Sequence, residues 1–185
     1  MKIKSTAVSV VALLISGCTS MGVVAGSANE GERVGMNMQE AVDRADGILD
    51  ETFSGIDPPV EWVHGESTEG GCDVSRRRAV VTVISDRRRG SFLGVVERGW
   101  QKAGYRQIGV NAGEERPATY FETPDGFRVR LLVGGRGQAF FEVATPCVER
   151  SSVSKPAPPP GGAQHVGEPV PAPNVHSDFW SAGAS

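Results

Sequence analysis

The sequence predicts an α+β fold, a two-layer sandwich in which a mainly antiparallel sheet carries two helices on one face. Three observations predict it. Apolar residues recur with helical spacing over 37–53 and 90–103, a β-branched run spans 79–85, and short segments after Tyr105 alternate with a period of two. The expected order is α-β-α-β-β-β, ending in a meander of three strands, and we expect one disulfide.

The first helix has a start signal in Asn37 and Glu40, which are spaced as a capping box. Its apolar stripe contains Met38, Val42, Ala45, Leu49 and Phe53. The opposite side is rich in charged residues, which we interpret as a solvated face rather than a cation site. Gly55 and the prolines Pro58 and Pro59 end the helix.

The run at 79–85 is a predicted central strand, with an arginine triplet at each end. Arg76–Arg78 precede it and Arg87–Arg89 follow it. Since a strand of seven residues spans about 23 Å, we expect the two triplets at opposite poles. The second helix is expected over 90–103, followed by Gly104 as its C′ residue.

A short strand, which the expected order leaves out, is predicted over 106–110, and the three strands of the meander are predicted over 119–123, 127–133 and 138–145. Their apolar positions alternate with charged ones, so the sheet face away from the helices is expected to be partly wet. The residues expected on that face are Glu122, Arg128, Arg130 and Glu142.

The N-terminal segment has the three parts of an export signal. Lys2 and Lys4 precede an apolar stretch, and small residues follow it. The stretch is shorter than the ~20 residues that a membrane-spanning helix needs. Its end, Ile15-Ser16-Gly17-Cys18, resembles the bacterial lipobox, although Ile15 stands where Leu is commonest. This resemblance implies that Cys18 receives a diacylglyceryl group and becomes the first residue of the mature protein. The alternative is an ordinary signal peptide with a free cysteine nearby.

Export and lipidation leave Cys72 and Cys147, and two cysteines in an exported protein favour a disulfide over a metal site. Such a disulfide joins the start and the end of the strand region. Closing so long a loop contributes roughly 4 kcal/mol in the chain-entropy model.

Four regions follow from these patterns. Residues 1–17 are a lipoprotein signal peptide, 18–35 a flexible tether, 36–150 a single α+β domain, and 151–185 a disordered tail rich in Pro, Gly and Ala. Phe179 and Trp180 in that tail are a candidate docking motif, or part of a frayed end. The formal net charge is −3 and becomes −5 without Lys2 and Lys4, which argues against a nucleic-acid partner.

One candidate anion site stands out. Arg87, Arg88, Arg89, Gly90 and Ser91 place arginines at the start of a helix, where free N–H groups and the helix dipole favour an anion. The alternative is a solvated basic loop. His64 is the only histidine in the expected domain, and no pattern of a nucleophile, metal site or cofactor site accompanies it.

Residues 62–147 resemble exported actinobacterial lipoproteins of unknown function. The resemblance depends on Trp62, the Gly70-Gly71-Cys72 turn, Val83-Ile84-Ser85, Trp100 with Gly104-Tyr105, Thr123 to Phe127, and Pro146-Cys147. We therefore expect a non-enzymatic binding or interaction module. It would be anchored by lipid to the outer face of the cell membrane and would bind an envelope protein or an anionic ligand. The alternatives are a hydrolase or transferase that acts on the cell wall or lipids through His64 or paired carboxylates, and an accessory subunit of a membrane complex.

Overall fold

The computed structural model describes residues 35–113, 116–134, 137–157 and 169–184. The expected signal segment, Cys18 and nearly all of the expected tether lie outside them. Among the described residues, no helix combines the length and the apolar character needed to cross a membrane.

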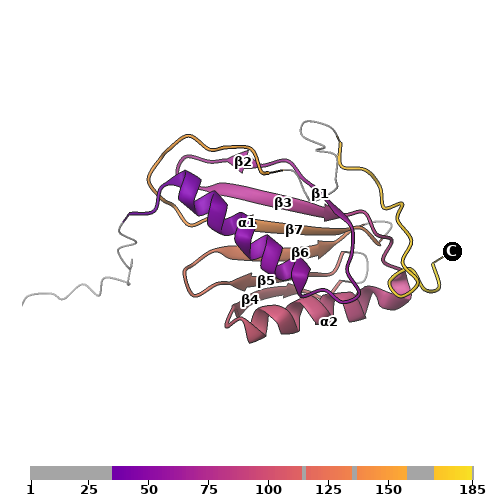
Figure 1. The fold of residues 1–185 in the computed structure, drawn as a ribbon. Coiled ribbons are helices and arrows are strands. Elements are labelled where there is room, and N and C mark those ends of the chain that lie inside the picture. Colours follow the sequence, from indigo (N-terminus) through magenta and orange to yellow (C-terminus); the bar gives the residue numbers. More distant parts are fainter. Residues whose placement is uncertain (1–34, 114–115, 135–136, 158–168, 185) are drawn as a thin grey trace, which may run out of the picture. The chain divides into compact units, whose positions relative to one another are not determined.

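The described chain contains two helices and a seven-stranded antiparallel sheet, which confirms the α+β class (Figure 1). The sheet order is β1-β3-β7-β6-β5-β4, with β2 paired to β3. The elements are α1 (Met38–Ser54), β1 (Trp62–His64), β2 (Thr68–Glu69), β3 (Val74–Val80), α2 (Asp86–Lys102), β4 (Arg106–Asn111), β5 (Ala118–Glu122), β6 (Arg128–Val133) and β7 (Ala139–Ala144).

The predicted order α-β-α-β-β-β is therefore wrong in its number of strands. Three strands lie between the helices and four follow α2. The short β1 and β2 were not expected because residues 60–72 have no clear periodicity. They form by pairing with β3, a long-range interaction that local pattern does not contain.

Helix α1 begins as the sequence predicts. The Asn37 side chain accepts the Glu40 N–H at 3.0 Å, and the Glu40 side chain accepts the Asn37 N–H at 3.0 Å. This reciprocal capping box satisfies two N–H groups that the first turn leaves open.

The predicted strand at 79–85 is misplaced, since β3 ends at Val80. Its partner β7 begins at Ala139, which leaves no ladder partner beyond that point. The chain then pairs with the C-terminal segment instead: Val83 N–H donates to Val175 O at 2.8 Å, and Asn174 N–H donates to Val81 O at 2.9 Å. The triplet Arg76–Arg78 consequently lies inside a strand rather than before one.

Helix α2 begins four residues earlier than predicted, at Asp86, so Arg87–Arg89 belong to its first turn. Its end agrees with the sequence. Gly104 has a φ of 83°, and Tyr105 N–H donates to Trp100 O at 2.9 Å. These are the conformation and the bond of a Schellman motif.

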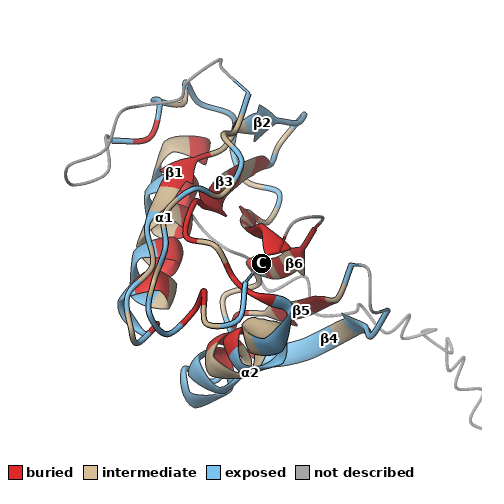
Figure 2. Cartoon of the chain, turned by 90° about the vertical axis from the view of Figure 1, so that its right-hand side faces the viewer, coloured by how far each residue is buried: buried red, intermediate tan, exposed pale blue. Residues whose placement is uncertain are grey.

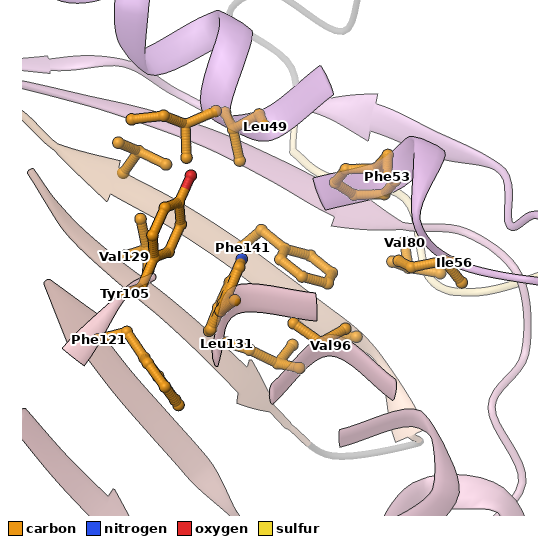
Figure 3. Close-up of a cluster of buried hydrophobic side chains, with 14 of the residues drawn as sticks. Leu49, Phe53, Ile56, Val80, Val96, Tyr105, Phe121, Val129, Leu131 and Phe141 are labelled. Carbon is orange, nitrogen blue, oxygen red and sulfur yellow. The ribbon is translucent and has the colours of Figure 1, made fainter. Parts of the chain in front are cut away.

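Aromatic side chains join both helices to β7. The Phe141 ring centroid lies 4.7 Å from that of Phe53 in α1, and 6.2 and 6.4 Å from those of Phe92 and Trp100 in α2. Figure 3 shows Phe141 among side chains from α1, α2 and the strands. By contrast β4, at the edge of the sheet, is exposed along most of its length (Figure 2).

The C-terminal segment is part of the core, so the predicted disordered tail is wrong for residues 169–184. The Trp180 side chain is fully buried, its ring packs edge-on against Phe92 at 5.2 Å, and its Nε1 donates to Pro58 O at 2.6 Å. Ser85 N–H donates to Trp180 O at 3.0 Å. Composition suggested too little apolar surface for ordering, but one large indole supplies it.

The predicted disulfide is confirmed. Cys72 and Cys147 are bonded, with their Cα atoms 4.8 Å apart and 75 positions between them in sequence. The bond joins the residues just before β3 and just after β7, which are neighbours in the sheet.

We expect Trp180→Ala to lower the free energy of unfolding by about 3–5 kcal/mol, because it removes a fully buried indole from a packed core. Urea denaturation at pH 7 measures this change. Phe179→Ala is the matched control. Its ring is 37% exposed and contacts Arg88, so it should cost about 1 kcal/mol or less. Equal losses in the two variants would contradict this account of the tail.

We expect replacement of both Cys72 and Cys147 by alanine to lower the free energy of unfolding by about 4 kcal/mol, the loop-closure value for 75 residues. Wild-type protein treated with reductant should show the same loss. A change below about 1 kcal/mol in either experiment would argue against this contribution.

Candidate functional site

Charged side chains gather on the side of the sheet opposite the aromatic core. In β7, Ala139, Phe141 and Val143 are buried, so alternation directs Glu142 to the other side. Strand register then places Arg77 of β3 and Arg130 of β6 directly beside Glu142. One cross-strand row therefore has an arginine on each side of a glutamate.

Both arginines of this row bind the same carboxylate oxygen. Arg77 Nε donates to Glu142 Oε2 at 2.7 Å, and Arg130 Nη2 donates to the same oxygen at 2.6 Å. The Glu142 side chain is 18% exposed, whereas those of Arg77 and Arg130 are about one-third exposed. Arg77 Nη1 also donates to Glu66 O at 3.0 Å and to Thr68 Oγ1, so this guanidinium is largely bound within the chain.

A second row repeats the arrangement. Arg106 of β4 and Arg128 of β6 both pair in register with Glu122 of β5. Their nitrogens lie 2.9 and 3.9 Å from the Glu122 carboxylate, and their side chains are 70% and 74% exposed. We call the two rows the arginine face, made of Arg77, Arg106, Glu122, Arg128, Arg130 and Glu142.

The arginine face carries four arginines and two glutamates, so it bears two surplus positive charges on a chain whose net charge is −3. Next to it lies a hollow of about 420 Å³, whose wall includes Glu122, Arg128, Asp73 and the disulfide residue Cys147. Guanidinium groups recognise carboxylate and phosphate oxygens with directed pairs of N–H bonds. The arrangement therefore favours an anionic ligand.

The other two arginines of the triplet face α1. Arg76 Nε lies 3.3 Å from the Asp46 carboxylate, and Arg78 Nη2 lies 2.7 Å from that of Asp50. Both guanidiniums are buried, and that of Arg78 stacks on the Trp62 ring at 3.9 Å. Burial lowers the pKa of Arg78, which Asp50 and Asp46 oppose, and burial raises the pKa of Asp46 against the effect of both arginines.

His64 lies beside this buried cluster. Its Nε2 is 2.8 Å from the Ala157 carbonyl, which can only accept, so Nε2 carries the proton. The ring also meets Trp62 edge-on at 5.0 Å. Within the described residues no hydrogen bond joins His64 to a serine, cysteine or carboxylate, and these contacts indicate a packing role.

The predicted anion site is not gathered around one cavity. Arg88 stacks over the Phe179 ring at 4.0 Å, and Arg89 pairs with Asp86 in its own turn. The Ser85 hydroxyl donates to Ala182 O at 2.8 Å, so the tail covers the residue that precedes the helix. Gly90 and Ser91 are exposed on α2. Arg88 and Arg89 therefore already have partners within the chain. The anion site at residues 87–91 stays a prediction.

The sequence identified four members of the arginine face and missed Arg77 and Arg106. Arg77 was assigned to a loop before the strand, and Arg106 is the first residue of an edge strand. An alternating Arg-x-Arg pattern was visible only in β6. In the described residues, no group of three His, Cys, Asp or Glu side chains lies in a metal-binding arrangement.

Comparisons with protein-family models, with curated proteins and with solved structures found no match for this chain.

Burial lowers the pKa of His64, against the opposing effect of the Ala157 carbonyl. Because the unfolded chain binds a proton first as the pH falls, stability is present above about pH 6.5 and is lost below it. We expect the free energy of unfolding to fall between pH 7 and pH 5, by no more than about 1.4 kcal/mol per pH unit from this group. His64→Gln should reduce that slope in urea denaturation. Equal slopes in wild type and His64→Gln would contradict the assignment.

Proposed function

We propose that this protein is an exported lipoprotein, anchored to the outer face of the cell membrane, whose α+β domain binds an anionic envelope component on the arginine face. The observation that carries the proposal is that four arginines share two glutamates on one side of the sheet. The lipobox-like end of the apolar segment and the Cys72–Cys147 disulfide support an exported location.

The proposal includes a two-layer arrangement with both helices on one face of the sheet. It is supported by Phe141, whose ring contacts Phe53 of α1 and Phe92 of α2 from the same side of β7. The opposite side is then free for a ligand, except where Val170 and Val175 of the C-terminal segment pack against the cluster of Val63, Ala79 and Val81.

The ligand class is a polymer or surface with closely spaced phosphate or carboxylate groups. The two rows are offset by two residues along β6, which places Arg128 and Arg130 on the same side with different exposure. An anion that reaches Arg106 and Arg128 can compete for them with Glu122, since one carboxylate serves both. The His64-dependent hydrolase receives no support from the contacts of that side chain.

We expect the double substitution Arg106→Gln and Arg128→Gln to weaken binding of long-chain polyphosphate at least tenfold, which corresponds to about 1.4 kcal/mol. The wild-type affinity should fall steeply with added salt, because the arginines are exposed. Isothermal titration calorimetry of the full chain carrying Cys18→Ser measures both.

Arg98→Gln with Arg150→Gln is the control, because it removes the same charge from exposed positions outside the arginine face. If both double variants bind equally weakly, the attraction is a general effect of charge and the site is elsewhere. Unchanged binding by the Arg106 and Arg128 variant would also reject the arginine face.

A further inference from the structure

A cavity of about 220 Å³ lies between the C-terminal halves of the two helices. Its wall includes Ile56 just after α1, Val96 and Trp100 of α2, and Tyr105 just after α2. Ile56, Val96 and Tyr105 come from separate parts of the chain and belong to one buried hydrophobic cluster, in which Figure 3 labels them. The cavity is formed by other residues than the arginine face.

Two polar side chains of the wall, those of Trp100 and Thr52, are already bound within the chain. Trp100 Nε1 donates to Thr52 Oγ1 at 2.9 Å, and Thr52 Oγ1 donates to Ile48 O at 2.8 Å. A polar ligand would therefore find few partners inside, whereas an apolar group loses nothing by entering. An apolar cavity of about 150 Å³ is large enough to bind benzene, so this one is large enough for part of an alkyl chain.

Gly99 contributes an open part of this wall. A glycine inside a helix costs about 1 kcal/mol relative to alanine, and no positive φ or close contact requires one here. A Cβ built at Gly99 would meet no atom within 4 Å. Because Gly99 lines the cavity and has open space at its Cβ position, we expect a larger side chain there to occupy part of the cavity.

The rim has charges of both signs. Glu51 lies 3.7 Å from Arg44, so its charge is partly compensated. Lys102 is exposed, and the described residues provide it with no ion pair within 4.0 Å. Arg44 also pairs with Asp125 at 3.2 Å, so the rim attracts an anion at Lys102 and not at the Glu51 side. An anionic group that leaves the cavity beside Lys102 would meet an ammonium with no carboxylate within 4.0 Å among the described residues.

We propose that the cavity binds the alkyl chain of a fatty-acid-like amphiphile and that Lys102 binds its carboxylate. The apolar wall selects the chain, and the rim charge selects an anionic over a neutral head group. This site is independent of anion binding on the arginine face.

Titration of the full chain with sodium decanoate, below its micelle concentration, tests the proposal. The Trp100 indole N–H signal in ¹⁵N NMR should shift saturably, because this group lies in the cavity wall. The corresponding signals of Trp62 and Trp180 should stay nearly constant. Gly99→Leu should lower the affinity at least tenfold, because its side chain occupies the cavity.

Gly47→Leu is the matched control, since Gly47 also lies inside a helix with no atom near its Cβ position and outside the cavity. It should keep the wild-type affinity. Should Gly99→Leu fail to fold, Val95→Trp fills the same cavity from the neighbouring turn and should have the same effect.

Lys102→Gln should weaken decanoate several-fold and leave decanol unchanged. Equal shifts of all three indole signals, or wild-type affinity in the variants that fill the cavity, would overturn the proposal. Equal decanoate affinities for Lys102→Gln and wild type would overturn the assignment of the head group.

Discussion

The Phe141 ring lies in the middle of β7 and packs against one aromatic side chain of α1 and two of α2. The two helices have few direct contacts with each other. The Phe141 ring and the side chains around it therefore connect them through the sheet. Because side chains of a strand alternate, the position of Phe141 also determines where Glu142 points. The packing of the core therefore decides which charges appear on the opposite side.

The same alternation divides the triplet in β3. Arg77 lies beside Glu142, whereas Arg76 and Arg78 turn toward α1 and meet Asp46 and Asp50. A buried guanidinium without a counter-charge would cost several kcal/mol. The acidic residues of α1 compensate these two, and the Trp62 ring adds a cation–π contact. The charged face of α1, which the sequence analysis interprets as solvated, thus includes two aspartates that are counter-charges of arginines in β3.

Local signals were sufficient for some elements. Asn37 and Glu40 predicted the start of α1, and Gly104 predicted the end of α2, because caps depend on residues within one turn. The disulfide followed from the number of cysteines. The predicted position of β3 was wrong because β-branched residues favour a strand only where a partner exists, and the partner strand β7 begins at Ala139, opposite the end of β3. The orientation of Arg76 and Arg78 toward α1 could not be predicted, because nothing in the local sequence shows that the aspartates of that helix lie near them.

The prediction of a disordered tail was also wrong because of a long-range contact. Average composition does not show that one residue decides the placement of residues 169–184, since Trp180 enters the core between Phe92 and the Pro58 carbonyl. Once it is buried, the preceding segment passes Val81 and Val83 and forms backbone hydrogen bonds with them. Val170 and Val175 then pack against a small buried cluster that includes Val81. The tail thus removes apolar area from the ligand-facing side and leaves the charged rows open.

The net charge of the chain affects how a polyanion approaches the arginine face. The chain is acidic overall, with a net charge of −3, so a polyanion is not attracted at distances well beyond the Debye length of about 8–10 Å. Attraction begins only near the surplus charge of the arginine face, where Arg106 and Arg128 extend into solvent. The proposed membrane anchor would offset this weakness, because it would keep the domain close to the proposed envelope ligands and replace long-range steering with a high local concentration. We therefore expect anion binding to depend both on the modest local charge of the arginine face and on the proposed lipid at Cys18.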